Sequence, residues 1–196
     1  MTEWTDEEEF QRYVEDLKLK PEDFEKKILD VGAGAAQFAK WAKEHGISRQ
    51  IYSLEPQRDY LQESYKGVAG KAEELPFKDG SFDLAVSSAA IPNIYIDEND
   101  QDKVKEKITK SLSEILRVIR PGGEARLARV LMGKEYEGQR ILSESVEEVL
   151  EELEATGGVQ IEKIRTPAND TYEYEGKRPV KLLAEAYLII IRKDEK

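Results

Sequence analysis

The sequence contains no cysteine, a single histidine and no long apolar segment. Without cysteine, no disulfide, zinc–thiolate site or cysteine nucleophile can form. The longest apolar run, residues 188–191, is far shorter than the roughly 18 residues that cross a membrane. The acidic first ten residues also lack the basic-then-apolar plan of a signal peptide. These absences predict a cytoplasmic, globular protein without a membrane segment.

Basic residues are also in short supply, with 30 Lys and Arg against 41 Asp and Glu and a net charge of -11. Nucleic-acid backbones bind surfaces rich in lysine and arginine, so the balance argues against a nucleic-acid partner. A length of 196 residues suits one domain with its own core. We expect a helical segment at 1–26, packed on the domain or acting as a lid, before a core at 27–192.

The strongest pattern lies at residues 28–36. An apolar strand at 27–31 runs into a turn containing Gly32 and Gly34, and a helix follows with Phe38, Trp41 and Ala42 on one face. Strand, glycine turn and helix form the opening unit of a doubly wound α/β domain. A tight turn without a ligand is the alternative, but the flanking strand and helix favour a nucleotide-type site.

Asp30 indicates which ligand the turn can accept. A carboxylate two positions before Gly32 would repel the pyrophosphate of a dinucleotide. The third glycine of the dinucleotide motif would fall at residue 37, which is Gln37. A dinucleotide-dependent oxidoreductase is therefore disfavoured, whereas a ligand carrying an ammonium group suits Asp30.

Residues 30–36, Asp-Val-Gly-Ala-Gly-Ala-Ala, resemble the first motif of the Rossmann-like S-adenosylmethionine-dependent methyltransferases, with Ala36 in place of the third glycine. Residues 72–77 and 114–123 are similar to further stretches of that family, and the likeness extends over residues 28–191. The resemblance implies a doubly wound, mostly parallel seven-stranded sheet with an antiparallel last strand and helices on both faces. It also implies S-adenosyl-L-methionine as the cofactor.

Glu55 ends the second predicted strand, about 20 residues after the glycine turn, where an acid suits the hydroxyls of a ribose. An acid favoured by the following helix dipole is the alternative. We expect Glu55 to be exposed and to contribute little to stability. Lys71 replaces the aspartate that commonly meets the adenine amino group in relatives. The predicted cofactor-binding residues are Asp30, Gly32, Ala33, Gly34, Glu55, Pro56, Ala72, Glu73, Ser87 and Ser88.

Candidates on the acceptor side are Arg129, Tyr95 and Tyr136, with Tyr172 and Tyr174 as further tyrosines, and each could instead pack or pair structurally. His45 falls at the far end of the first helix and is expected away from the site. No catalytic residue and no metal site are identified. The sequence thus predicts a methyltransferase acting on a small molecule. The alternatives are a cofactor-binding protein without transfer activity and a protein methyltransferase. The oligomeric state is not indicated.

Further elements follow from apolar periodicity and from turn residues. Strands are predicted at 50–54, 67–69, 82–87, 125–131, 159–164 and 182–191, and a long helix at 101–119. A helix is also predicted after Pro56, and another capped by Ser145 with Glu148. Residues 166–180 are predicted to form a polar loop.

Overall fold

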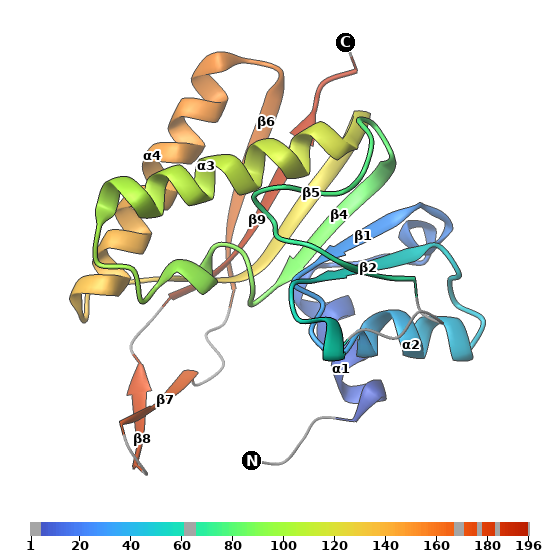
Figure 1. The fold of residues 1–196 in the computed structure, drawn as a ribbon, viewed down its shortest axis with the longest axis horizontal. Helices are drawn as coiled ribbons and strands as arrows, with labels where there is room; N and C mark the ends of the chain where they lie inside the picture. Colours follow the sequence, from blue (N-terminus) through green and yellow to red (C-terminus); the bar gives the residue numbers. More distant parts are fainter. Residues whose placement is uncertain (1–4, 61–65, 167–170, 176–177, 183–184, 196) are drawn as a thin grey trace.

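One seven-stranded sheet forms the centre of the protein (Figure 1). The structure, a computed structural model, describes residues 5–60, 66–166, 171–175, 178–182 and 185–195, without side-chain detail at 171–182. The strands are β1 (Ile28–Val31), β2 (Ile51–Glu55), β3 (Gly67–Ala69), β4 (Phe82–Ser88), β5 (Ile119–Met132), β6 (Val159–Thr166) and β9 (Glu185–Lys193). Their order is β3-β2-β1-β4-β5-β9-β6, and β9 runs antiparallel to both of its neighbours. The predicted fold class is confirmed.

Helices cover both faces of the sheet, and the central strands are therefore buried on both sides. On one face lie α1 (Asp6–Asp16) and α2 (Gln37–Glu44), and on the other α3 (Gln101–Val118) and α4 (Glu137–Thr156). Side chains alternate along β1: Leu29 and Val31 join the core under α3 and α4, whereas Ile28 joins the core under α1 and α2. Asp30 therefore faces the side of α1 and α2.

The N-terminal segment packs firmly on the domain. Helix α1 begins with a capping box, in which the Thr5 side chain and the Glu8 carboxylate each accept from the other's backbone N–H. Phe10 and Tyr13 are buried and stack on Phe38 of α2, with ring centroids 5.6 and 4.5 Å away. A 3₁₀ turn, η1 (Pro21–Glu25), then leads into β1. This packing places α1 beside the carboxylate of Asp30.

Some predicted boundaries are wrong. Helix α4 begins at Glu137, and Ser145 lies fully buried inside it, because a Ser-x-x-Glu pattern also occurs in helix interiors where it caps nothing. The predicted polar loop contains a hairpin of β7 (Thr171–Glu175) and β8 (Arg178–Leu182). After Pro56 the structure has η2 (Arg58–Tyr60), and the remainder of the helix predicted there, at 61–65, lies outside the described residues.

In the described part of the chain, no helix is long and apolar enough to cross a membrane. The carboxyl ends of β1, β2 and β4 all lie at one edge of the sheet, since these strands are parallel. In doubly wound folds, ligands bind at that edge.

Candidate functional site

The glycine turn after β1 contacts Leu54 of β2 on one side and Ala90, which follows β4, on the other. The N–H groups of Gly32 and Ala33 both donate to the carbonyl of Leu54, at 2.9 and 3.0 Å, and thereby join the end of β1 to β2. Gly32 adopts a left-handed φ of 78°, and a Cβ placed on it would lie 2.4 Å from the Cβ of Ala90. Glycine is therefore required here for both conformation and space.

Ala36 occupies the place of the third glycine of the motif. It is fully buried at the start of α2 and has a left-handed φ of 56°, a conformation that glycine adopts without strain. The alanine thus keeps the backbone path of the motif and adds a buried methyl group.

Glu55 is built into this turn from the end of β2. Its carboxylate accepts from the backbone N–H of Gly34 at 3.1 Å and from that of Gln57 at 3.3 Å, and the residue is only 8% exposed. The prediction of an exposed Glu55 is wrong, because the turn directs these N–H groups at the carboxylate. The same residue supports the turn and borders the space above it.

That space is a cavity of about 490 Å³, which we call the strand-end cavity. Seven of the predicted cofactor residues line it: Gly32, Gly34, Glu55, Pro56, Ala72, Glu73 and Ser88. The remaining lining residues are Val31, Leu54, Gln57, Gly70, Lys71, Ala89, Ala90, Ile91 and Ile94. Residues far apart in the sequence thus meet at the carboxyl edge of β1, β2 and β4.

Three predicted residues do not line the cavity. Asp30 is fully buried on the other side of the turn, where its Oδ1 accepts from the Tyr13 hydroxyl at 3.3 Å. The N–H of Ala33 is bonded to Leu54. The Ser87 hydroxyl donates to the carbonyl of Val31 at 2.9 Å and accepts from the N–H of Ile91 at 3.0 Å. Ser87 therefore holds β1 and β4 together.

One end of the cavity is apolar, and local sequence patterns did not predict it. Ala89, Ala90 and Ile91 follow β4, and Ile94 is 58% exposed beside the cavity. Among them Ser88 is 6% exposed, and its Oγ has no partner among the described residues. A buried hydroxyl without a partner is a group that a ligand can satisfy. Ser88 is predicted from its place at the end of a strand, whereas no motif marks Ala90, Ile91 or Ile94, so only the fold reveals these three.

Other lining residues of the cavity carry charges. Lys71 is exposed, and Glu73 lies close to the buried Tyr95. The Tyr95 hydroxyl is 2.7 Å from Ser111 Oγ, and burial, with the Glu73 carboxylate nearby, raises the pKa of Tyr95. Tyr95 is therefore held inside the protein and is not among the residues that line the cavity.

Arg129, Tyr136 and His45 do not line the cavity. Arg129 is half-buried and pairs with Asp16 of α1, with 3.6 Å between Nη1 and Oδ2. Tyr136 precedes α4, and its half-buried ring does not line the cavity. His45 is exposed at the end of α2, where its ring nitrogen Nδ1 is 3.0 Å from the Trp41 carbonyl. The side chains of Tyr172 and Tyr174 lie outside the described residues.

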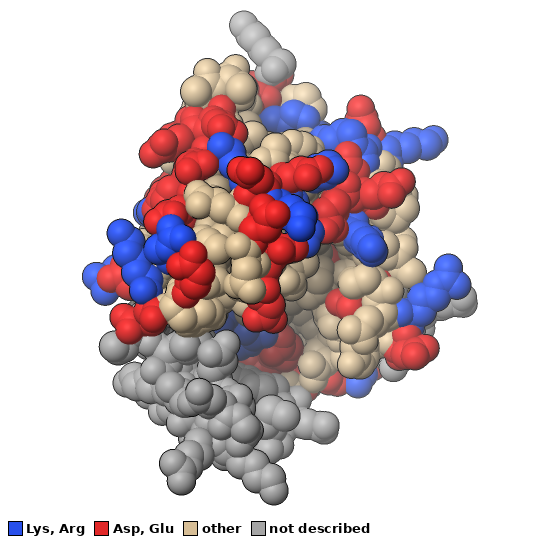
Figure 2. All heavy atoms as spheres, turned by 60° about the vertical axis from the view of Figure 1, so that its left-hand side comes forward, with Lys and Arg blue, Asp and Glu red and all other residues tan. Residues whose placement is uncertain are grey.

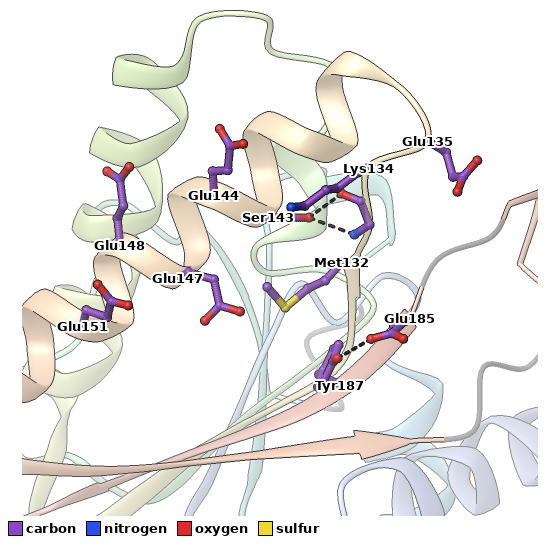
Figure 3. A pocket seen from close by; sticks show the side chains of 11 residues that line it. Met132, Lys134, Glu135, Ser143, Glu144, Glu147, Glu148, Glu151, Glu185 and Tyr187 are labelled. Atoms are coloured by element: carbon purple, nitrogen blue, oxygen red, sulfur yellow. Dashed lines mark hydrogen bonds between the residues drawn. The ribbon is translucent and has the colours of Figure 1, made fainter.

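A second hollow, of about 600 Å³, lies between α4, the end of β5 and the start of β9 (Figure 3). It is lined by Met132, Gly133, Lys134, Glu135, Ser143, Glu144, Glu147, Glu148, Glu151, Glu185 and Tyr187. We call it the acidic groove.

Although the acidic groove is the larger hollow, most of its carboxylates are already paired. Glu148 pairs with Lys105, Glu147 with Lys163, Glu144 with Arg140, and Glu185 with Arg165. Figure 2 likewise shows basic side chains interspersed among the acidic ones on one face of the protein. In the described part of the chain, no group of three or more His, Cys, Asp or Glu residues is arranged to hold a metal ion. The strand-end cavity is therefore the better candidate site.

The strand order, the glycine turn and the acid at the end of β2 together define a Rossmann-like nucleoside-binding protein. The methyltransferase domain family matches residues 29–127 of the chain. The chain therefore belongs to the Rossmann-like S-adenosylmethionine-dependent methyltransferase family, as its motifs predict. S-adenosylmethionine is the cofactor of that family.

The chain is similar to relatives with different acceptors. It is 30% identical to norajmaline N-methyltransferase of Rauvolfia serpentina, over 58% of this chain and 37% of that protein. It is 27% identical to the mouse tRNA (carboxymethyluridine(34)-5-O)-methyltransferase ALKBH8, over 66% of this chain and 18% of that protein. The chain thus spans well under half the length of these relatives.

The fold also matches solved structures. An S-adenosylmethionine-dependent methyltransferase from Methanosarcina mazei superposes with a TM-score of 0.57 at 17% identity, covering 87% of this chain and 93% of the other. At this identity the match shows the fold alone.

Proposed function

We propose that this chain binds S-adenosylmethionine in the strand-end cavity and transfers its methyl group to a small-molecule acceptor. The observation that carries the proposal is the enclosure of one cavity by the glycine turn, Glu55 and the segment at Ala72 and Glu73. A volume of about 490 Å³ lies within the usual range of small-molecule sites.

The residues present fit the cofactor. The Glu55 carboxylate, already bonded to Gly34 and Gln57, retains acceptor capacity for the ribose hydroxyls. Glu73 is the acidic side chain on the wall near Lys71, where it can accept from the adenine amino group. Ser88 offers a hydroxyl without a described partner at the apolar end. Asp30 is proposed for the cofactor ammonium, and the acceptor would lie against Ile94.

S-adenosylmethionine supplies an electrophilic methyl group, so the protein's task is alignment and exclusion of water. Ala90 and Ile91, which are buried, keep water from the part of the cavity that they line. None of the lining residues is assigned as a general base, which an acceptor needs only if it must lose a proton.

A nucleic-acid acceptor is disfavoured, although the relative ALKBH8 is named for action on tRNA. The net charge of -11 opposes binding of a phosphate backbone. Helix α4 adds to that opposition, because it carries many glutamates and a single arginine. Two hypotheses compete with a small-molecule acceptor: methylation of a protein, and binding of the cofactor without transfer.

The test is release of S-adenosylhomocysteine from S-adenosylmethionine in the presence of small amines, phenols, carboxylic acids, tRNA and peptides. Turnover with a small molecule supports the proposal. Turnover with tRNA or peptides alone would overturn the acceptor class. Tight cofactor binding without turnover on any acceptor would favour a protein that binds the cofactor and transfers nothing.

A further inference from the structure

A short 3₁₀ turn after β4, η4 (Asn93–Tyr95), places an exposed isoleucine in the lining of the strand-end cavity. Ile94 is 58% exposed, although the residues on either side of it are fixed. The Asn93 side chain bonds to two backbone groups of β5, at 2.7 and 3.0 Å. The hydroxyl of the buried Tyr95 is 2.7 Å from a serine hydroxyl of α3. The turn therefore holds Ile94 outward rather than letting it join the core.

Exposed apolar side chains of this size are rare in the part of the chain that the structure describes. There are three: Ile47, Tyr60 and Ile94. Ile94 is the most exposed of these three, and it alone among them lines the cavity. A single apolar side chain on an open surface needs no explanation. At the wall of a cavity, however, it offers apolar area that a bound ligand can remove from water.

The cavity has a charged part and an uncharged part. Five lining residues lie at or after the end of β4, and none of them is charged: Ser88, Ala89, Ala90, Ile91 and Ile94. The charged lining residues are Glu55, at the end of β2, and Lys71 and Glu73, which follow β3. Strand β1 lies between β2 and β4, so the ends of β2 and β4 are about 10 Å apart, two strand spacings.

Charged groups that adjoin the uncharged part have partners of their own. The N–H of Ala89 donates to the carbonyl of Ala128 on β5, and the next residue, Arg129, pairs with Asp16 of α1. Glu73 lies close to the Tyr95 hydroxyl, beside α3. A charged ligand group placed against Ile94 would therefore lose water without gaining an unpaired counter-ion on β4 or β5, which is costly. A cation that reaches Glu73 is the competing ligand class.

Ser88 is the one polar side chain of the uncharged part. It is 6% exposed, and its Oγ has no partner among the described residues. A buried hydroxyl without a partner gains stability when a ligand completes its hydrogen bond. Because a hydroxyl can donate and accept, it suits a neutral O–H or N–H group.

We propose that the methyl acceptor is an uncharged, largely apolar molecule that packs on Ile94 and bonds to Ser88 through a single hydroxyl or amino group. This inference rests on the proposed function, because it takes the β4 side of the strand-end cavity as the acceptor site. It narrows the acceptor from any small molecule to those without a carboxylate, phosphate or ammonium group.

The experiment titrates three phenols of different charge into the protein in the presence of saturating S-adenosylhomocysteine at pH 7. 4-Ethylphenol is neutral, tyramine is a cation and 4-hydroxyphenylacetate is an anion, and all three share one ring and one hydroxyl. We expect 4-ethylphenol to bind about tenfold or more tightly than either charged phenol. Equal or tighter binding of a charged phenol, or no binding of any phenol, would overturn this inference and leave the cofactor assignment intact. Failure of S-adenosylhomocysteine itself to bind would overturn the proposed function as well.

Three variants test the two contacts. Ile94→Ser should weaken 4-ethylphenol binding about 3- to 10-fold, while the affinity for S-adenosylhomocysteine changes by less than about twofold. Ser88→Ala should weaken 4-ethylphenol about 2- to 10-fold but leave ethylbenzene, which lacks the hydroxyl, unaffected. Ile47→Ser, at an exposed isoleucine that does not line the cavity, is the matched control and should behave as the parent.

The two ligands separate a hydrogen bond from a change in packing. An equal loss of 4-ethylphenol and ethylbenzene affinity in Ser88→Ala, or no loss of either, would refute the bond to Ser88. Unchanged 4-ethylphenol binding by Ile94→Ser would refute the apolar contact.

Discussion

Replacing Glu55 tests whether one carboxylate supports both the glycine turn and the cofactor. In the structure Glu55 is 8% exposed and accepts from Gly34 and Gln57 at 3.1 and 3.3 Å. Glu55→Ala removes both hydrogen bonds, so the backbone N–H groups of Gly34 and Gln57 lose their acceptor and must bond to water instead. Glu55→Gln keeps one carbonyl acceptor and removes the charge.

The magnitude follows from the two hydrogen bonds. Bonds to a charged group contribute about 1.5–3 kcal/mol each when buried, and here both are only partly buried. We therefore expect Glu55→Ala to lower the free energy of unfolding by about 2–4 kcal/mol, and Glu55→Gln by about 1–2 kcal/mol. For a chain of this size, each kcal/mol of lost unfolding free energy lowers Tm by about 2–4 °C. Glu55→Ala should therefore lower Tm by about 4–16 °C.

The effect on the cofactor is measured separately, by calorimetry with S-adenosylhomocysteine under conditions where each variant is folded. Loss of both ribose bonds should weaken binding by about 2–4 kcal/mol, which is roughly 30- to 1,000-fold. The control is Glu74→Ala, an exposed glutamate that does not line the cavity. An unchanged Tm for Glu55→Ala would refute the support of the turn, and an unchanged affinity would refute the ribose contact.

The remaining predictions use simple measurements. S-adenosylhomocysteine at about 100 times its Kd should stabilise the protein by about 2.7 kcal/mol in a thermal-shift series, and NAD should not; the opposite ranking would refute the cofactor assignment. Ala89→Gly should stabilise the protein by about 0.5–1 kcal/mol in urea denaturation, because Ala89 is exposed at a φ of 56° and glycine relieves that strain; a loss of stability would contradict this. The folded state holds the proton of Asp30 to a higher pH than the unfolded chain does, so the parent should lose unfolding free energy, relative to Asp30→Asn, as the pH rises from about 4 to about 8. A difference in unfolding free energy between the two proteins that is the same at pH 4 and pH 8 would refute a raised pKa. Gel-shift titrations at ordinary salt should show no appreciable binding of DNA or RNA, and salt-sensitive submicromolar binding would overturn that expectation.

Local sequence patterns are sufficient where a single segment determines its own structure. The strand and turn at 27–34 are recognisable because apolar residues run into glycines, and the turn geometry then follows from the left-handed φ of Gly32 and Gly34. The spacing from this turn to Glu55 is sufficient to place an acid beside it, since β1 and β2 pair in register.

Contacts between distant segments are not recoverable from such patterns. The burial of Glu55 depends on the N–H groups of Gly34 and Gln57, which only the folded turn brings to it. The Tyr13–Asp30 contact requires α1 to lie across the sheet face, and an apolar stripe on α1 does not say which strand it covers. The cap predicted at Ser145 fails for a related reason: burial in the middle of α4 overrides a local pattern.

Backbone strain gives a further reason to place the function at the carboxyl edge of the sheet. Five non-glycine residues among those described adopt a left-handed φ: Lys18, Ala36, Ala89, Lys66 and Arg129. Ala36, Ala89 and Arg129 follow or interrupt β1, β4 and β5 near the strand ends, and each such residue costs about 1–2 kcal/mol. Asn93 offsets part of that cost, because its side chain donates to the Arg129 carbonyl at 2.7 Å and accepts from the Leu131 N–H at 3.0 Å. Strain held in place by such bonds concentrates at functional sites. Three of these five strained residues, Ala36, Ala89 and Arg129, lie near the edge of the sheet that holds the strand-end cavity, so the backbone supports the same location that the cavity and the glycine turn indicate.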